Sequence, residues 1–303
     1  MQKFYANGKL LLTGEYLVLD GALAIALPTK LGQSLTVEPN QAQKLVWESQ
    51  NSKSYPWFQH SYTQLHQKID DNPIAERLRI ILLQAQKQNP AFINSLVDNV
   101  TTKLTFPRNW GLGTSSTLIS LIAQWAKCNP YELLFEAFGG SGYDIACAEA
   151  DSPISYQLQG KNNPVFEAVD FNPSFKDQLY FVYLDKKQNN KKGIARYRAK
   201  GIISNSKIQK ISTLSTELIH LCELNAFEKL LKEHESIVSE LIGFEKVQSI
   251  YFSDYWGLVK SLGAWGGDFV LATSSRSFAE TKKYFNEKGF NVFLKYSELI
   301  KTK

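Results

Sequence analysis

The segment Gly111-Leu112-Gly113-Thr114-Ser115-Ser116 is the part of this sequence best suited to bind an anion. Its two glycines let a ligand approach the backbone closely, and apolar residues at helical spacing after it predict a helix that begins near Thr114. The first turn of a helix carries unpaired N–H groups, which bind phosphate, and the hydroxyls offer an oxygen to Mg²⁺. A capped helix after a tight turn is the alternative, and no lysine follows as in a P-loop.

Two charged residues could take part in the same chemistry. Asp144 follows Ser141-Gly142-Tyr143 at the start of a predicted small-residue helix, where the helix dipole keeps a carboxylate ionised and ready to accept a hydroxyl proton. The spacing of Ser141 and Asp144 is also close to a capping box, in which both side chains only satisfy helix-start amides. Lys9 lies between Gly8 and an apolar strand segment, and an ordinary surface lysine is the alternative for it.

Other kinds of site find less support. The four histidines show no zinc-ligand spacing, and no Gly-x-Ser-x-Gly segment of a serine hydrolase occurs. The net charge of +5 comes from residues 185–200, which hold seven bases and one acid. This pattern indicates a basic loop that faces an anion, because a nucleic-acid surface spreads its bases over several elements. Lys187 and Arg196 are candidate ligands there, and a solvated loop is the alternative.

The elements expected in the first half of the chain begin with sheet. Residues 3–37 are expected to form strands, residues 44–60 a hairpin and residues 74–87 a helix. A strand, the glycine loop and the helix from Thr114 follow. A second glycine loop then opens the short helix that carries Asp144.

The second half is expected to alternate in the same way. In order, the pattern predicts a buried strand over residues 178–184, the basic loop, helices over 204–243 and 247–262, the glycine cluster 263–267, a strand over 268–273, a helix over 278–288 and a last strand over 291–294. Gly289 is a plausible end for the helix before it.

Length and composition indicate a globular protein of two lobes or of one unusually large domain. The chain has 303 residues, about twice a typical domain, and 44% of them are hydrophobic. Three cysteines without a CxxC pair are typical of a reducing compartment. No run of eighteen apolar residues and no signal-peptide pattern occurs, so a cytoplasmic protein without a membrane partner is expected.

Taken in chain order, four segments resemble the motifs of the GHMP kinases, the superfamily of galactokinase and of homoserine, mevalonate and phosphomevalonate kinases. They are the first motif Gly8–Tyr16, the phosphate loop Gly111–Ser116, the acidic segment Gly140–Asp144 and the third motif Gly263–Phe269. The resemblance implies an α+β fold of two domains with the active site between them. A ribosomal protein S5 domain 2-like N-terminal domain is expected over residues 1–168, and a ferredoxin-like C-terminal domain over residues 169–303.

The same resemblance implies ATP as the phosphoryl donor and Mg²⁺ as its metal. Gly111, Leu112, Gly113, Thr114, Ser115 and Ser116 would bind the phosphates, with Ser115 as the Mg²⁺ contact. Asp144 would be the catalytic acid/base and Lys9 the neighbouring cation. Further residues implied at the site are Glu15, Gly263, Ala264, Gly266 and Gly267. Glu136 is the candidate for a second Mg²⁺ ligand, and an exposed helix face is the alternative for it.

The acceptor is expected to be small and anionic. The first motif and the acidic segment are most similar to those of phosphomevalonate kinases, whereas the chain length is closer to mevalonate kinases. We therefore expect transfer of the γ-phosphoryl group to mevalonate or phosphomevalonate, in isoprenoid precursor synthesis, by a monomer or homodimer without a nucleic-acid partner. A sugar or homoserine kinase and a catalytically silent ligand-binding protein are the alternatives. Trp110, Trp265 and Asp268 depart from the family pattern near the nucleotide loops.

Overall fold

The chain forms two compact units that interleave along the sequence. The computed structural model describes residues 1–42, 44–93, 97–160, 162–186, 190–263, 265 and 267–302, with residues 190–192 described by their backbone only. The first unit comprises Met1–Gly8, Leu31–Arg108 and Leu112–Glu149, and the second comprises Lys9–Lys30, Asn109–Gly111 and Ala150–Lys303. Both contain strands and helices, so the expected α+β class is confirmed. The domain boundary at residues 168 and 169 stays a prediction.

The first unit is built on a mixed sheet. The C-terminal half of β2 (Ala24–Pro39) pairs antiparallel with β5 (Asp98–Leu104), and β5 pairs in parallel with β3 (Leu45–Gln50). Strand β3 then forms the expected hairpin with β4 (Pro56–Tyr62), and β1 (Gln2–Leu11) pairs with β2. Alternating apolar residues on these strands place one face of the sheet in the core.

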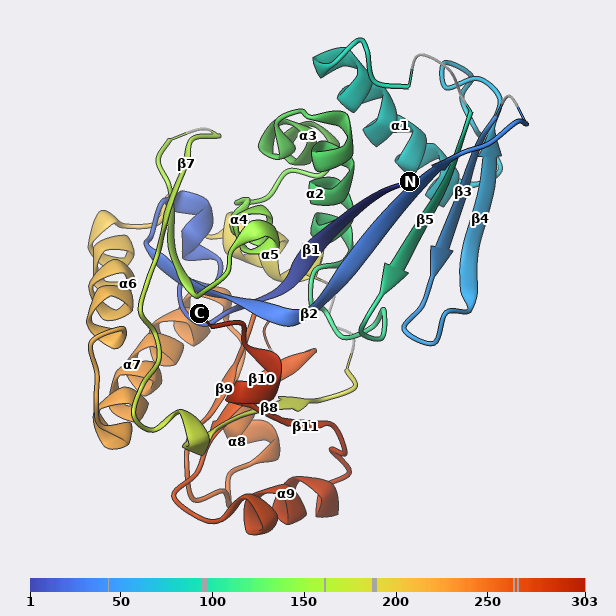
Figure 1. The fold of residues 1–303 in the computed structure, drawn as a ribbon. Coiled ribbons are helices and arrows are strands. Elements are labelled where there is room, and N and C mark those ends of the chain that lie inside the picture. The colour runs from blue at the N-terminus through green and yellow to red at the C-terminus, as the bar shows by residue number, and fades with distance from the viewer. Residues whose placement is uncertain are drawn as a thin grey trace. The chain divides into compact units, whose positions relative to one another are not determined.

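Among the described residues, four helices complete the first unit. They are α1 (Pro73–Gln88), α2 (Thr114–Ala126), α3 (Pro130–Ala137) and α4 (Tyr143–Glu149). Leu78, Ile81 and Leu82 of α1 belong to the same apolar core as Trp47 and Val100 of the sheet. Figure 1 shows α1 lying along the strands and α2 beside it. Helices α3 and α4 both pack against α2.

The second unit contains two groups of strands. The N-terminal half of β2 pairs with β6 (Ile154–Leu158), and β6 pairs with β7 (Pro164–Ala168). A separate antiparallel sheet has the order β11-β8-β10-β9. Its members are β8 (Leu179–Tyr183), β9 (Val259–Ser261), β10 (Phe269–Thr273) and β11 (Phe293–Lys295).

Helices account for much of the rest of the second unit, which contains this four-stranded sheet. They are α5 (Asn190–Ala199), α6 (Asn205–Leu218), α7 (Leu224–Ile242), α8 (Val247–Tyr251), α9 (Phe278–Glu287) and α10 (Tyr296–Leu299), with short 3₁₀ turns at Leu17–Asp20 and Lys176–Gln178. Figure 1 shows α8 and α9 on one side of the sheet, where Phe252 and Phe285 join a core with Val182 and Val270. Helices α6 and α7 run side by side. In the described part of the chain, no helix is long and apolar enough to cross a membrane.

Two expectations about secondary structure are wrong. Much of the expected basic loop, residues 190–199, is the helix α5, because its buried Tyr197 stacks on Tyr16 and stabilises a helix that its polar composition disfavours. The helix expected over 247–262 ends at Tyr251, and β9 follows. Gly257, two residues before β9, lets the chain approach the end of β10 closely, because a Cβ there would lie 2.2 Å from the backbone oxygen of Thr273.

Candidate functional site

The phosphate loop of the first unit ends in an accessible helix start. Gly113 caps α2 with φ of 93°, a left-handed conformation that glycine adopts without strain, and no acidic residue lies in the first turn. Ser115 is exposed, whereas the buried Ser116 donates from Oγ to the Gly113 carbonyl at 2.8 Å. The hydroxyls of Thr114 and Ser115 make no hydrogen bond within the described chain. The helix start therefore offers amides and two hydroxyl groups to an anion and its metal.

The beginning of the same loop belongs to the second unit, where three segments meet at Gly111. Lys9 Nζ donates to the Gly111 carbonyl at 3.0 Å. A Cβ on Gly111 would lie 2.0 Å from Oδ2 of Asp268, so the carboxylate is packed directly against the glycine. Gly111 also has φ of 67°. These contacts bring a residue of the first motif and one of the third motif to the start of the phosphate loop.

Trp110, one of the departures from the family pattern, anchors this segment. Its ring lies 5.8 Å from that of Tyr183 and 5.4 Å from that of Phe269, between centroids. Tyr183 also donates its hydroxyl proton to the Asn109 carbonyl at 2.9 Å, and burial raises the pKa of this tyrosine to about 12. The tyrosine therefore stays neutral, and the aromatic packing fixes the backbone that carries Gly111.

Asp144 and Glu136 lie in the first unit. Asp144 is half-buried in the first turn of α4, where its Oδ1 accepts from the Ile145 amide at 3.1 Å. Glu136 is exposed on α3. Among the described residues, no group of three His, Cys, Asp or Glu side chains is arranged to hold a metal ion. The exposed Ser115 suits Mg²⁺ that is bound mainly by nucleotide phosphates, and the role of Glu136 stays a prediction.

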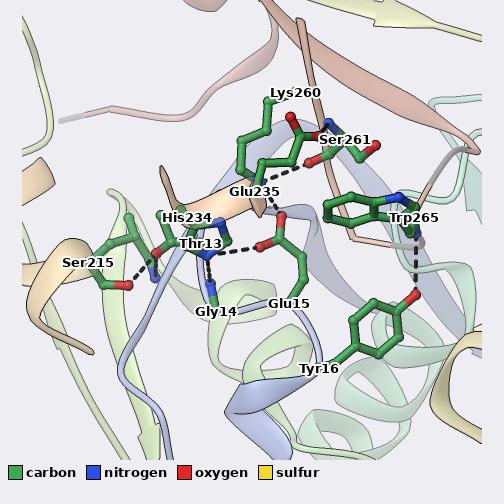
Figure 2. Close-up of polar contacts among 11 residues, drawn as sticks. Thr13, Gly14, Glu15, Tyr16, Ser215, His234, Glu235, Lys260, Ser261 and Trp265 are labelled. Atoms are coloured by element: carbon green, nitrogen blue, oxygen red, sulfur yellow. Dashed lines mark hydrogen bonds and ion pairs between the residues drawn. The ribbon is translucent and has the colours of Figure 1, made fainter. Parts of the chain in front are cut away.

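Glu15, the acid of the first motif, lies in a buried polar cluster. Figure 2 shows its carboxylate directed toward Lys260 of β9 and His234 of α7. Lys260 forms a hydrogen-bonded ion pair with Glu15, and His234 Nε2 lies 3.4 Å from Oε2 of the same carboxylate. All three side chains are at most 1% exposed. Burial raises the pKa of Glu15, and the Lys260 ammonium partly offsets this effect.

The cluster also binds backbone. His234 Nε2 accepts from the Gly14 amide at 2.9 Å, so this histidine carries its proton on Nδ1. Burial, together with the charge of Lys260, lowers the pKa of His234 well below its usual value and keeps the ring neutral. Oε1 of Glu235, the next residue of α7, accepts from the Ser261 amide at 2.9 Å. The turn after β1 and the strand β9 are thus held by the same group of side chains.

The third motif is described in part. Gly263, Trp265, Gly267 and Asp268 are among the described residues, while Ala264 and Gly266 lie outside them. Trp265 is only 4% exposed, and its Nε1 donates to the Glu245 carbonyl at 2.9 Å, so the indole lies inside the second unit. Its backbone amide donates to the Tyr16 hydroxyl at 3.4 Å (Figure 2). The large residue in place of a family glycine is therefore a packing element between two motifs.

Several basic side chains of residues 185–200 already contact other parts of the protein. The guanidinium of Arg196 lies 4.3 Å from the centre of the Phe244 ring, and Arg198 forms an ion pair with Asp20 at 2.7 Å. Lys186 lies over the Tyr251 ring at 3.6 Å. Lys187 lies outside the described residues. Anion binding by Arg196 and Lys187 stays a prediction.

Comparison with known proteins gives the fold. No family model and no curated protein matches the sequence. Solved structures match over the whole chain. Mevalonate kinase of Methanococcus jannaschii is 15% identical with a TM-score of 0.71, covering 100% of this chain and 98% of that one. Phosphomevalonate kinase of Streptococcus pneumoniae, in complex with phosphomevalonate and AMPPNP, is 16% identical with a TM-score of 0.69, covering 97% and 100%.

The same architecture occurs in a sugar kinase. The D-glycero-D-manno-heptose 1-phosphate kinase of Bacteroides thetaiotaomicron is 14% identical with a TM-score of 0.70, covering 99% of this chain and 96% of that one. The chain has the fold of the GHMP kinases. The two-domain GHMP kinase fold expected from the four motifs is therefore confirmed. At these identities the likeness establishes the fold, and the acceptor has to be argued from the site.

Lys260, His234 and Glu235 were missed by the sequence analysis. The sequence nevertheless contains a pattern that could have identified each of them. Lys260 is a lone charge inside the apolar segment 258–262, and His234 and Glu235 lie between Leu231 and Val238 on the apolar face of α7. Ionisable residues at positions that helical or strand periodicity assigns to the core indicate buried polar contacts.

Stability against pH should report the burial of Glu235. Burial raises its pKa to about 7 from an ordinary value of 4.5, so between these pH values the folded protein retains a proton that the unfolded chain has released. The free energy of unfolding should therefore fall as pH rises through this window, by at most about 3 kcal/mol. Glu235→Gln keeps an acceptor for the Ser261 amide and should remove this slope. Urea unfolding of both proteins from pH 4.5 to 8 measures the effect.

The comparison of the two proteins is necessary because His234 acts in the opposite direction. Its lowered pKa makes the unfolded chain bind the extra proton, so its contribution to stability rises with pH up to about its ordinary value of 6.5. This contribution is present in both proteins and cancels in the difference. Parallel stability curves for wild type and Glu235→Gln would contradict the assignment.

Proposed function

We propose that this chain is an ATP-dependent small-molecule kinase that transfers the γ-phosphoryl group to mevalonate or phosphomevalonate. The observation that carries the proposal is the phosphate loop, with its accessible helix start after Gly113 and its Gly111 backbone bound by Lys9. Two of the matching structures are a mevalonate kinase and a phosphomevalonate kinase bound to its acceptor and a nucleotide analogue. An acceptor of this kind would place the enzyme in isoprenoid precursor synthesis.

Each candidate residue has a chemical role in this proposal. The amides of Gly111–Ser116 bind the phosphates, and Ser115 contributes an oxygen to Mg²⁺, which when bound neutralises phosphate charge. Lys9 offsets negative charge that gathers on the transferred group, because phosphoryl transfer is catalysed mainly by positioning and charge neutralisation. Asp144 accepts the proton of a hydroxyl acceptor. Glu136 is proposed as a further Mg²⁺ contact.

The acceptor is proposed to be anionic because of the basic residues around α5. Residues 185–200 contain seven bases and one acid, and only Arg198 among the described ones forms an ion pair. The exposed Arg196 and, from the same basic stretch of sequence, Lys187 are the proposed ligands of a carboxylate or phosphate group on the acceptor. A neutral sugar would gain little from this charge. Mevalonate and phosphomevalonate both carry the required anionic group.

Replacement of Gly111 by alanine should weaken ATP binding. The added methyl group would lie 2.0 Å from the Asp268 carboxylate, so the loop or Asp268 must move. We expect the dissociation constant for ATP to rise by about tenfold or more, which corresponds to about 1.4 kcal/mol. Isothermal titration calorimetry measures the constant directly.

Gly201→Ala is the matched control for this substitution. Gly201 has φ of 73°, similar to the 67° of Gly111, but its added Cβ would meet nothing within 4 Å. Both variants therefore carry the same left-handed backbone cost, and only Gly111→Ala disturbs the loop. ATP affinity equal to that of Gly201→Ala in a folded Gly111→Ala protein would remove this loop from the nucleotide site.

Asp144→Asn and Lys9→Met together should report the acceptor. A hydroxyl acceptor must lose a proton, and loss of a general base typically costs about 10²- to 10⁴-fold in kcat. A phosphate acceptor is largely deprotonated at neutral pH, since its second pKa is about 6, and needs a cation more than a base. Asp144→Asn should thus be the more damaging change with mevalonate, and Lys9→Met the more damaging with phosphomevalonate. Nearly full kcat in Asp144→Asn would exclude Asp144 from the mechanism.

A further inference from the structure

Four ionisable side chains lie together in the interior of the second unit. Glu15, His234, Glu235 and Lys260 are each at most 1% exposed. Removing charges from water costs several kcal/mol per ion, and well-packed apolar residues of similar size are often as stable as a buried ion pair or more so. Stability alone therefore gives little reason for charges at these positions.

The network is also incompletely satisfied. His234 Nδ1 has no hydrogen-bond partner in the described part of the chain. A buried polar group without a partner costs free energy that an apolar residue would avoid. The cluster is thus not arranged for maximal stability, and its hydrogen bonds and ion pair show which segments it holds.

The cluster contacts two short segments of the chain, residues 14–15 and residues 260–261. On one side, His234 accepts from the Gly14 amide and Lys260 binds the Glu15 carboxylate. On the other side, Lys260 Nζ donates to the Ser261 carbonyl at 2.8 Å, and Glu235 accepts from the Ser261 amide. The cluster therefore ties residues 14–15 to residues 260–261.

The turn it holds is strained. Tyr16 has φ of 65° and ψ of −48°, and the Leu17 amide donates to the Glu15 carbonyl at 2.8 Å, so Tyr16 is the central residue of a strained γ-turn, a conformation that costs about 1–3 kcal/mol. Gly14 has φ of 87°, and a Cβ there would lie 2.6 Å from the Cβ of Ala24. Such a backbone persists only where its surroundings enforce it. The hydrogen bond of His234 at Gly14 and the ion pair of Lys260 at Glu15 are buried contacts that help to enforce it.

Each of the two segments that the cluster connects is close in the chain or in the sheet to a residue that contacts Gly111, namely Lys9 or Asp268. The turn directly continues β1, which carries Lys9, and Lys9 binds the Gly111 carbonyl. Strand β9 pairs with β10, with Ser261 opposite Val270, and the Leu262 amide donates to the Phe269 carbonyl. Asp268, packed on Gly111, precedes β10 directly. A shift of the turn relative to β9 would therefore move Lys9 relative to Asp268.

We propose that Glu15, Lys260 and His234 are positioning residues, which lock the first-motif turn onto β9 and thereby hold Lys9 and Asp268 at Gly111 for phosphoryl transfer. The inference rests on the proposed kinase function for its catalytic consequence. None of the three touches the reacting atoms in this account. They act through Lys9 and the phosphate loop, where a misplacement of about 1 Å can cost roughly a hundredfold in rate.

The double variant Glu15→Leu/Lys260→Met, assayed below pH 7 where Glu235 stays protonated, tests the proposal without leaving an unpaired buried charge. Because apolar residues replace the whole pair, the midpoint of thermal unfolding should stay equal to that of wild type or rise. The kcat should nevertheless fall by about a hundredfold, and hydrogen exchange of the Gly14 amide should become at least about tenfold faster. The matched control is Lys210→Met/Glu233→Leu, an exposed ion pair at 2.7 Å, which should leave kcat and Gly14 exchange unchanged.

Two variants of His234 give an independent readout. In His234→Gln the amide oxygen can still accept from the Gly14 amide, whereas His234→Leu removes the acceptor. His234→Gln should therefore retain most of the wild-type kcat, and its Gly14 amide should exchange as slowly as in wild type. His234→Leu should have a lower kcat and a faster exchange of the Gly14 amide. A purely structural role predicts instead that activity falls only in proportion to stability.

The outcomes separate this inference from the proposed function. Wild-type kcat and exchange in the Glu15→Leu/Lys260→Met protein would overturn it. The inference would also be overturned if activity fell only in parallel with stability and His234→Gln were no more active than His234→Leu. If wild type phosphorylates no acceptor, the kinase proposal fails, and faster Gly14 exchange in a stable double variant still supports the positioning of the turn.

Discussion

Gly111 imposes the constraint on which the candidate site depends, because its backbone has no room for even one methyl group. The Asp268 carboxylate occupies the space that a Cβ would need, and Lys9 binds the carbonyl of the same residue. These contacts bring the first motif and the third motif, far apart in the sequence, to the start of the phosphate loop. Trp110 packs next to this point and fixes the backbone there.

The interiors of the two units differ in polarity. The core of the first unit is apolar, with α1 and α2 against the sheet, and its functional groups lie at the starts of helices. The second unit places Glu15, His234 and Lys260 where a core would normally be apolar. This arrangement gives up stability that apolar side chains would supply, and in return it specifies the conformation of a strained turn.

Much of the fold could be predicted because its signals are local. The hairpin of β3 and β4, helix α1 and the start of α2 near Thr114 follow from periodicity and turn residues. Helix α5 could not be predicted in this way, since the packing of Tyr197 on Tyr16 stabilises it. Strand β9 was hidden for a similar reason, because Gly257 matters only through its contact with Thr273.

Some residues of the candidate site could likewise be predicted from local sequence, and others could not. The phosphate loop, Lys9 and Asp144 stand in recognisable motifs, so the sequence alone identifies them as candidates. His234 and Lys260 belong to no motif that we recognised, and their importance comes from a contact with Glu15 across more than two hundred residues. The packing of Asp268 on Gly111 is likewise a property of the folded chain.

The central claim is that the site phosphorylates a small anionic acceptor. The most direct test is a coupled ADP-release assay of the wild-type protein with Mg²⁺ and ATP over mevalonate, phosphomevalonate, homoserine and several sugars. We expect ADP release that depends on mevalonate or phosphomevalonate, with a matching phosphorylated product. Turnover only with a neutral sugar would contradict the acceptor assignment, and no acceptor-dependent turnover across the whole set would contradict the kinase assignment itself.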